Sequence, residues 1–175
     1  MPTDIYSLPV QDDNIDKMQT LDFDLKAYMP VLATAYGEAF GMSREFKIHV
    51  LSSILNRAET GKEEFGAQNA QISEVLRKGY YAYSKQSPKY KEAINQKFPD
   101  KMSENDFKEF PALMSGILKG VIKRSDAMYF LTDKEAKNQS WSKNLKVIDR
   151  REGFNFYNNE NVGTKKSPKK LAAMR

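Results

Sequence analysis

Two consecutive segments repeat their apolar residues at the spacing of a helix, and this restricts the chain to a mainly helical fold. Residues 27–41 carry one apolar stripe, and residues 44–58 carry a broader apolar face, which predicts a central helix buried on most sides. Gly41 is a stop signal for the first helix, and Ser43 is a suitable N-cap for the second. The stripe of the first helix consists of Tyr28, Val31, Leu32, Ala35, Tyr36 and Ala39.

The rest of the chain adds shorter elements. A third apolar pattern predicts a helix over residues 106–123, which begins at Pro111 if the proline occupies the first turn. "ISEVLRKG" predicts a short amphipathic helix, while "DAMYFLT" and "NLKVIDRREGFNFYN" are typical of strands or a hairpin. We therefore expect a mainly α (α+β) fold, a helical domain with a small β element near its C-terminal end.

The ends of the chain lack these patterns. Residues 1–26 predict an N-terminal arm, residues 27–160 one folded domain, and residues 161–175 a basic C-terminal tail. The tail, "TKKSPKKLAAMR", and the net charge of +5 indicate attraction to a polyanion or an acidic partner. The tail makes nucleic acid a conceivable partner, although "YYAYS" has no interleaved basic residues. No apolar run approaches the roughly 20 residues of a membrane span.

The composition narrows the possible chemistry. The chain has no cysteine and one histidine, His49, which excludes disulfides, thiolate zinc sites, His-rich metal sites and most Ser-His or Cys-His triads. Acid–base chemistry therefore falls to Asp, Glu, Tyr or Lys. We expect no metal and no cofactor.

One acid lies in an unusual setting. Glu38 lies at the edge of the first apolar stripe, between two glycines in "AYGEAFG". Partial desolvation there raises the pKa of a carboxyl group, as a general acid requires. The small neighbours would let a sugar ring reach the acid. The alternative is that Gly37 and Gly41 permit close helix packing while Glu38 is solvated.

Aromatic residues gather outside the predicted helices. Their faces suit the apolar faces of pyranose rings, although each one taken singly fits a core position better than a ligand platform. They are Tyr80, Tyr81, Tyr83, Tyr129, Phe130, Trp141, Phe154, Phe156 and Tyr157.

The order of several motifs resembles the SleB/CwlJ-type cell wall hydrolase family over roughly residues 27–158. The matching motifs are Tyr36-Gly37-Glu38-Ala39, Asn56-Arg57, Tyr83-Ser84, Gly120, Ala127-Met128-Tyr129-Phe130 and Phe156-Tyr157. This sequence departs from the family pattern at Phe40, Met42, Ala82 and Phe154, where the family has arginine, a second glutamate, glutamine and histidine.

The resemblance implies a lysozyme-like fold and cleavage of the β-1,4 bond between N-acetylmuramic acid and N-acetylglucosamine in peptidoglycan. It assigns catalysis to Glu38. Groove-lining roles fall to Tyr83, Ser84, Tyr129, Tyr157 and Asn56. Because no second carboxylate has a clear claim, we expect a single-acid lytic transglycosylase route; hydrolysis with Asp126, Asp149 or a carboxylate of segment 100–109 remains the alternative.

The N-terminal sequence contains no apolar stretch typical of a secretory signal. We therefore expect synthesis in the cytoplasm and delivery to the wall or periplasm by a phage virion, or during holin-assisted lysis, with the arm and tail contacting virion proteins. A different class of function stays open: a non-catalytic virion structural or nucleic-acid-binding protein that retains the fold.

Overall fold

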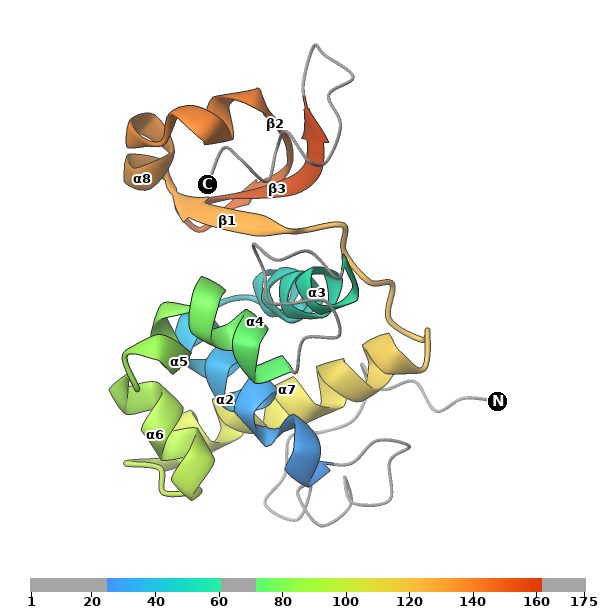
Figure 1. Ribbon diagram of the computed structural model, residues 1–175. Helices are drawn as coiled ribbons and strands as arrows, with labels where there is room; N and C mark the ends of the chain where they lie inside the picture. Colours follow the sequence, from blue (N-terminus) through green and yellow to red (C-terminus); the bar gives the residue numbers. More distant parts are fainter. Residues whose placement is uncertain (1–24, 61–71, 162–175) are drawn as a thin grey trace.

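The structure is a computed structural model that describes residues 25–60 and 72–161. It confirms a mainly helical fold with a small antiparallel sheet near the C-terminal end (Figure 1). In chain order the elements are α2 (Leu25–Ala39), α3 (Arg44–Thr60), α4 (Ile72–Gly79), α5 (Tyr81–Ser84), α6 (Pro88–Asn95), α7 (Lys101–Leu118), β1 (Tyr129–Thr132), α8 (Asp133–Asn138), the 3-10 helix η2 (Ser140–Asn144), β2 (Leu145–Arg151) and β3 (Phe154–Asn161).

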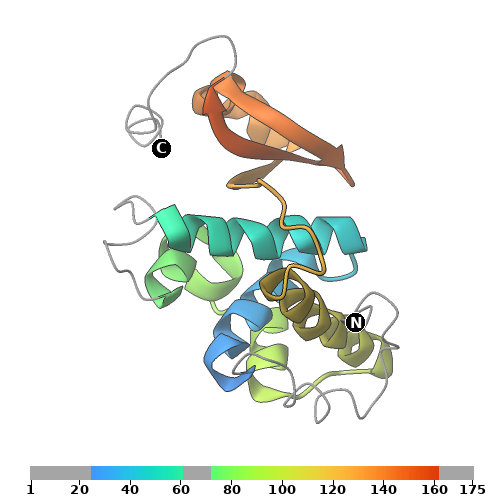
Figure 2. The ribbon, with the colours of Figure 1, turned by 90° about the vertical axis from the view of Figure 1, so that its right-hand side faces the viewer.

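Helix α3 is the central element, as the breadth of its apolar face predicts. In both views it lies between the sheet and the remaining helices (Figures 1 and 2). Its Phe46 meets the rings of Phe154 and Phe156 edge-on, each with centroids 5.0 Å away. The helix therefore joins the apolar face of the sheet to the helical body in one continuous core.

Helix α2 contributes the residues around which the other helices of the body pack. Tyr36 is fully buried, and four phenylalanine rings surround it at edge-on angles. Such pairs are favourable beyond the area they bury. The helix begins at Leu25, two residues before the predicted start.

The third predicted helix was placed too late in the sequence. Helix α7 begins at Lys101 because Asp100 caps it, accepting a hydrogen bond from the Ser103 N–H at 2.7 Å. Pro111 thus lies inside the helix and not in its first turn. The helix ends at Leu118, before Gly120, whose φ of +74° turns the chain back so that Ile122 packs onto Gly116.

Part of the aromatic run was also predicted wrongly as non-helical. Tyr81–Ser84 forms the single turn α5. Helix α6 follows, with the Ser87 hydroxyl accepting from the Tyr90 N–H and Pro88 in the first turn, the position where a proline loses no helical hydrogen bond.

The three strands pair in the order β1-β3-β2, all antiparallel. The register pairs Phe130 with Phe156 on the face that meets α3, and Tyr129 with Tyr157 on the opposite face. This second face packs a smaller cluster with Trp141 of η2. The sheet therefore has one face in the main core and one face covered by α8 and η2.

Within the described ranges, no helix has both the length and the apolar character to cross a bilayer. The predicted basic tail and nearly all of the predicted arm lie outside the described residues.

Candidate functional site

Glu38 lies in the last turn of α2, where its side chain reaches the start of α5. Its Oε1 accepts a hydrogen bond from the Ala82 N–H at 2.7 Å. Tyr80, the N-cap residue of α5, offers no side-chain cap of its own. Glu38 therefore supplies from another helix the acceptor that the first turn of α5 lacks.

The surroundings of Glu38 raise the pKa of its carboxyl group above the ordinary value of 4.5. Burial is the largest cause, because it disfavours the charged form. The Ala82 N–H and the Arg57 charge act against it and favour the carboxylate, whereas the negative charge of Glu135 raises the pKa further. The group therefore keeps its proton to a higher pH than an exposed glutamate, as expected for a general acid.

Arg57 is the cation of this site, and several elements fix it in place. Its Nε donates to the Met128 carbonyl at 2.7 Å, and its guanidinium lies 5.0 Å from the Tyr80 ring and 5.3 Å from the Tyr129 ring. Gly79 leaves the room this requires, since a Cβ there would come within 2.0 Å of an Arg57 nitrogen. The sequence identified Arg57 only as part of the Asn56-Arg57 motif and predicted no role for it. Gly79, which leaves room for its guanidinium, is the one signal in the sequence that accompanies this role.

The two glycines around Glu38 have structural explanations. A Cβ on Gly37 would lie 2.5 Å from the Cβ of Ala82, so the absence of a side chain lets α5 pack directly against α2. Gly41 has a φ of +72° just beyond the helix end, a conformation that glycine adopts most easily. The space at Gly37 is thus occupied by Ala82 instead of being open for a sugar ring. Glu38 itself is half-buried, whereas the packing alternative expected it to be solvated.

The predicted lining residues fall into two places. Tyr83 and Ser84 belong to α5, the turn that Glu38 caps; Tyr83 packs edge-on against Tyr90, and Ser84 is exposed. Tyr129 belongs to β1, and its ring lies 5.3 Å from the Arg57 guanidinium.

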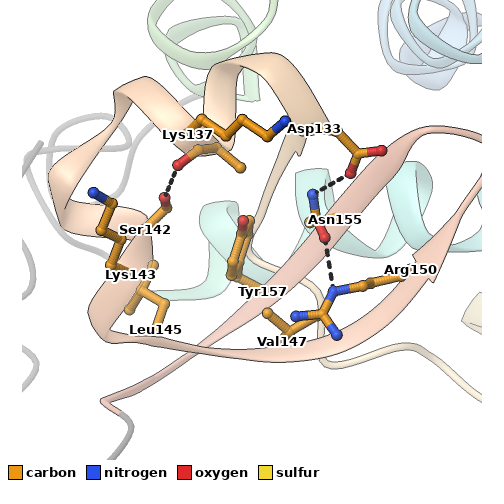
Figure 3. A pocket seen from close by; sticks show the side chains of 10 residues that line it. Asp133, Lys137, Ser142, Lys143, Leu145, Val147, Arg150, Asn155 and Tyr157 are labelled. Carbon is orange, nitrogen blue, oxygen red and sulfur yellow. Dashed lines mark hydrogen bonds between the residues drawn. The ribbon is translucent and has the colours of Figure 1, made fainter.

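The other two predicted residues are engaged elsewhere. Asn56 donates to the carbonyls of Ser125 and Ala127, both at 2.9 Å, and so holds the segment before β1 against α3. Tyr157 lines a pocket on the outer face of the sheet (Figure 3).

His49 lies in a constellation that sequence reasoning missed. Its Nδ1 is 2.6 Å from the Ser125 hydroxyl and its Nε2 is 2.8 Å from the Asp149 carboxylate. Arg151 also binds Asp149 at 2.6 Å. Burial alone would raise the pKa of Asp149, but the hydrogen bonds from Arg151 and His49 lower it overall. The carboxylate is therefore held charged between two partners, which does not suit it to act as the free second acid at Glu38.

Glu135 of α8 was not among the predicted candidates, although its negative charge contributes to the raised pKa of Glu38. It closes a capping box, with its carboxylate accepting from the Thr132 N–H at 2.8 Å.

Among the described residues, no group of three or more His, Asp or Glu side chains converges to hold a metal ion. The site thus consists of a half-buried acid, the Arg57 cation with its two tyrosine rings, and a carboxylate on α8 whose charge affects the pKa of Glu38.

The predicted aromatic platform is mostly core. Tyr80 and Phe156 are nearly or fully buried, whereas Tyr81 keeps 69% of its surface exposed.

Comparison with known proteins finds no family, no curated protein and no solved structure that matches this chain. Its function therefore has to be argued from the site.

Proposed function

We propose that this protein cleaves the glycan strands of peptidoglycan with Glu38 as the general acid. The observation that carries the proposal is the half-buried Glu38 carboxyl group, bound to the Ala82 N–H, with a pKa that burial raises. The ordered resemblance to SleB/CwlJ-type hydrolases, which places its catalytic glutamate at Glu38, points the same way. The proposal includes a lysozyme-like fold for the helical domain.

In the proposed reaction Glu38 gives its proton to the bridging oxygen as the glycosidic bond breaks. The resulting carboxylate then accepts the proton of the sugar's 6-hydroxyl, whose oxygen bonds to the anomeric carbon and closes a 1,6-anhydro ring. The 6-hydroxyl is part of the same sugar, so its attack benefits from a large effective concentration. Arg57 favours the carboxylate form of Glu38 that this second half requires.

Glu135 offers the competing hydrolytic route. A carboxylate near the acid can activate a water molecule as a general base or stabilise an oxocarbenium ion. The masses of the products separate the two routes, because 1,6-anhydro products are lighter by one water than hydrolytic products. We expect the anhydro products, since the Glu135 carboxylate is already engaged by the Thr132 backbone and hydroxyl.

The decisive test is clearance of purified peptidoglycan by Glu38→Gln. The amide keeps the size and an oxygen acceptor for the Ala82 N–H, so the variant should fold while losing activity at least about a hundredfold. Glu92→Gln is the matched control, because Glu92 is also half-buried and accepts a hydrogen bond, from the Tyr36 hydroxyl at 2.9 Å. An active Glu38→Gln protein would refute the proposal.

The setting in which this activity would operate is also proposed. Delivery by a virion, or during lysis, would bring the enzyme to the wall, with acidic virion proteins or another polyanion as partners for the basic tail. Removal of residues 164–175 should weaken particle assembly or wall binding, increasingly so at low salt, without lowering turnover of soluble glycan fragments. Unchanged binding and assembly would refute the role of the tail.

One observation favours a second candidate, a non-catalytic virion structural protein that retains the fold. Glu38 has a purely structural task as the cap of α5, and Ala82 occupies the space beside it. Under this alternative the wild-type protein is inactive on every type of wall, and Glu38→Gln changes only stability.

A further inference from the structure

The outer face of the sheet carries a pocket that the proposed glycan chemistry does not use. It has a volume of about 600 Å³ and lies between α8, η2 and the strands β2 and β3 (Figure 3). This volume falls within the range of small-ligand sites, roughly 300–1,000 Å³. The pocket is therefore large enough for a ligand several times the size of an inorganic ion.

The charges around the pocket favour an anion. Lys137 of α8, Lys143 of η2 and Arg150 of β2 line it, against one carboxylate, that of Asp133. Among residues 25–60 and 72–161, neither Lys137 nor Lys143 forms an ion pair or a side-chain hydrogen bond. The described part of the chain thus offers these two ammonium groups no ion-pair or hydrogen-bond partner.

The wall of the pocket is organised by hydrogen bonds between its polar residues. Arg150 donates from Nε to the Asn155 Oδ1 at 3.0 Å, and Asn155 donates from Nδ2 to Asp133 at 2.8 Å (Figure 3). Asn155 is only 6% exposed. These two hydrogen bonds orient the Arg150 guanidinium through its Nε and occupy one oxygen of the Asp133 carboxylate.

The remaining residues that line the pocket are mostly apolar. Leu145, Val147 and the ring of Tyr157 supply apolar surface. Burial raises the pKa of the Tyr157 hydroxyl, so this group remains protonated at neutral pH. An apolar surface with a neutral hydroxyl and several cations suits a ligand with both an apolar part and an anionic group.

We propose that this pocket is a binding site for an anionic ligand that carries a carboxylate or phosphate group on an apolar body. The basic side chains bind the charged group, while Leu145, Val147 and the Tyr157 ring contact the remainder. The proposal is independent of the chemistry at Glu38, because no residue of the pocket takes part in the proton transfers of the proposed glycan cleavage.

The chain contains its own reporter for this site. Trp141 is the sole tryptophan in the sequence, it precedes two pocket residues in η2, and its ring lies 6.5 Å from that of Tyr157. The test is a titration of tryptophan fluorescence with inorganic phosphate and, separately, sodium acetate, each at constant ionic strength maintained with chloride. We expect a saturable change with at least one of the two anions, and the stronger one identifies the charged group of the ligand.

Substitutions locate the binding. Lys143→Gln and Lys137→Gln should each weaken apparent affinity about three- to tenfold, as expected for loss of one charge-assisted contact. Lys134→Gln is the matched control, because Lys134 lies on α8, is exposed and does not line the pocket. Glu38→Gln should bind like the wild type, which separates this proposal from the proposed function.

Two outcomes would overturn the inference. The first is the absence of saturable binding with either anion, both in the fluorescence and in the amide NMR shifts of Asn155 and Tyr157. The second is binding that Lys134→Gln weakens as much as Lys143→Gln does, since this would show a general response to net charge.

Discussion

The helical body and the sheet use aromatic residues in contrasting ways. In the body, rings surround the fully buried Tyr36 and belong to one large core. In the sheet, only one face joins this core through Phe130 and Phe156, while the other face packs a small separate cluster of Met128, Tyr129, Leu145 and Tyr157. The body thus provides rigidity, and the outer face of the sheet retains a partly open, charged surface.

The contrast also separates the two candidate sites by charge. Glu38 is a half-buried acid where α2 meets α5, and burial raises its pKa. The pocket of the sheet gathers exposed cations. A half-buried acid with a raised pKa suits proton transfer, whereas exposed cations suit recognition of an anion, so the two regions are suited to different tasks.

The largest expected effect compares how much the main core and the small cluster of the sheet each contribute to the free energy of unfolding. Phe110→Ala should lower the free energy of unfolding by about 3–5 kcal/mol, because Phe110 is fully buried beside Tyr36. Leu145→Ala in the small cluster should cost less, about 2–3 kcal/mol, since that cluster borders the pocket and can adjust. Chemical denaturation of both variants measures the difference. Equal losses would show that the two clusters stabilise the protein alike.

The junction between body and sheet gives the second prediction. Asp149→Asn removes the charge that binds His49 and Arg151, and we expect a loss of about 1.5–3 kcal/mol at neutral pH. The lowered pKa of Asp149 means that this contribution is present above the ordinary value of 3.8 and is lost as the pH falls through the folded-state pKa. The difference between wild type and variant should therefore shrink in acid. A difference that stays constant between pH 6 and pH 2 would contradict this role.

The third prediction concerns the contact that places Glu38. Gly37→Ala should destabilise the protein by about 1–3 kcal/mol, because the new methyl group overlaps with that of Ala82. The double variant Gly37→Ala with Ala82→Gly should recover much of this loss, since one methyl group then takes the place of the other. Thermal unfolding of the two single variants and the double variant forms a double-mutant cycle. Strict additivity would rule out the proposed overlap.

The smallest effects concern the pKa of Glu38 itself. Arg57→Gln should raise this pKa, because it removes a charge that favours the carboxylate, and Glu135→Gln should lower it. Carbon-detected NMR titration of the Glu38 carboxyl group measures both shifts. Shifts in the same direction would contradict the arrangement of charges described here.

The raised pKa of Glu38 also has a consequence for stability. The folded protein holds this proton more tightly than the unfolded chain, so the contribution of Glu38 is fully present below pH 4.5 and falls as the pH rises through its folded-state pKa. Glu38→Gln lacks this dependence. Its stability relative to the wild type should therefore increase with pH across that interval.

The helical segments followed from the sequence because a helix forms from local periodicity. The apolar stripes located α2 and α3, and the alternating segments near the C-terminus located the sheet. The start of α7 was missed because Pro111 was read as a start signal, whereas the cap at Asp100 and the burial of Phe107 outweigh the hydrogen bond that a proline lacks. Local signals of similar strength competed there, and tertiary packing decided between them.

By itself, the sequence determined the mainly helical class, the central position of α3 and the unusual setting of Glu38. Tertiary structure alone decided that Ala82 fills the space at Gly37, that Arg57 lies between two tyrosine rings, and that Glu135 acts on Glu38. The physical reason is distance along the chain: periodicity is set by neighbours three or four residues apart, whereas these contacts join residues that only the packing of separate elements brings together.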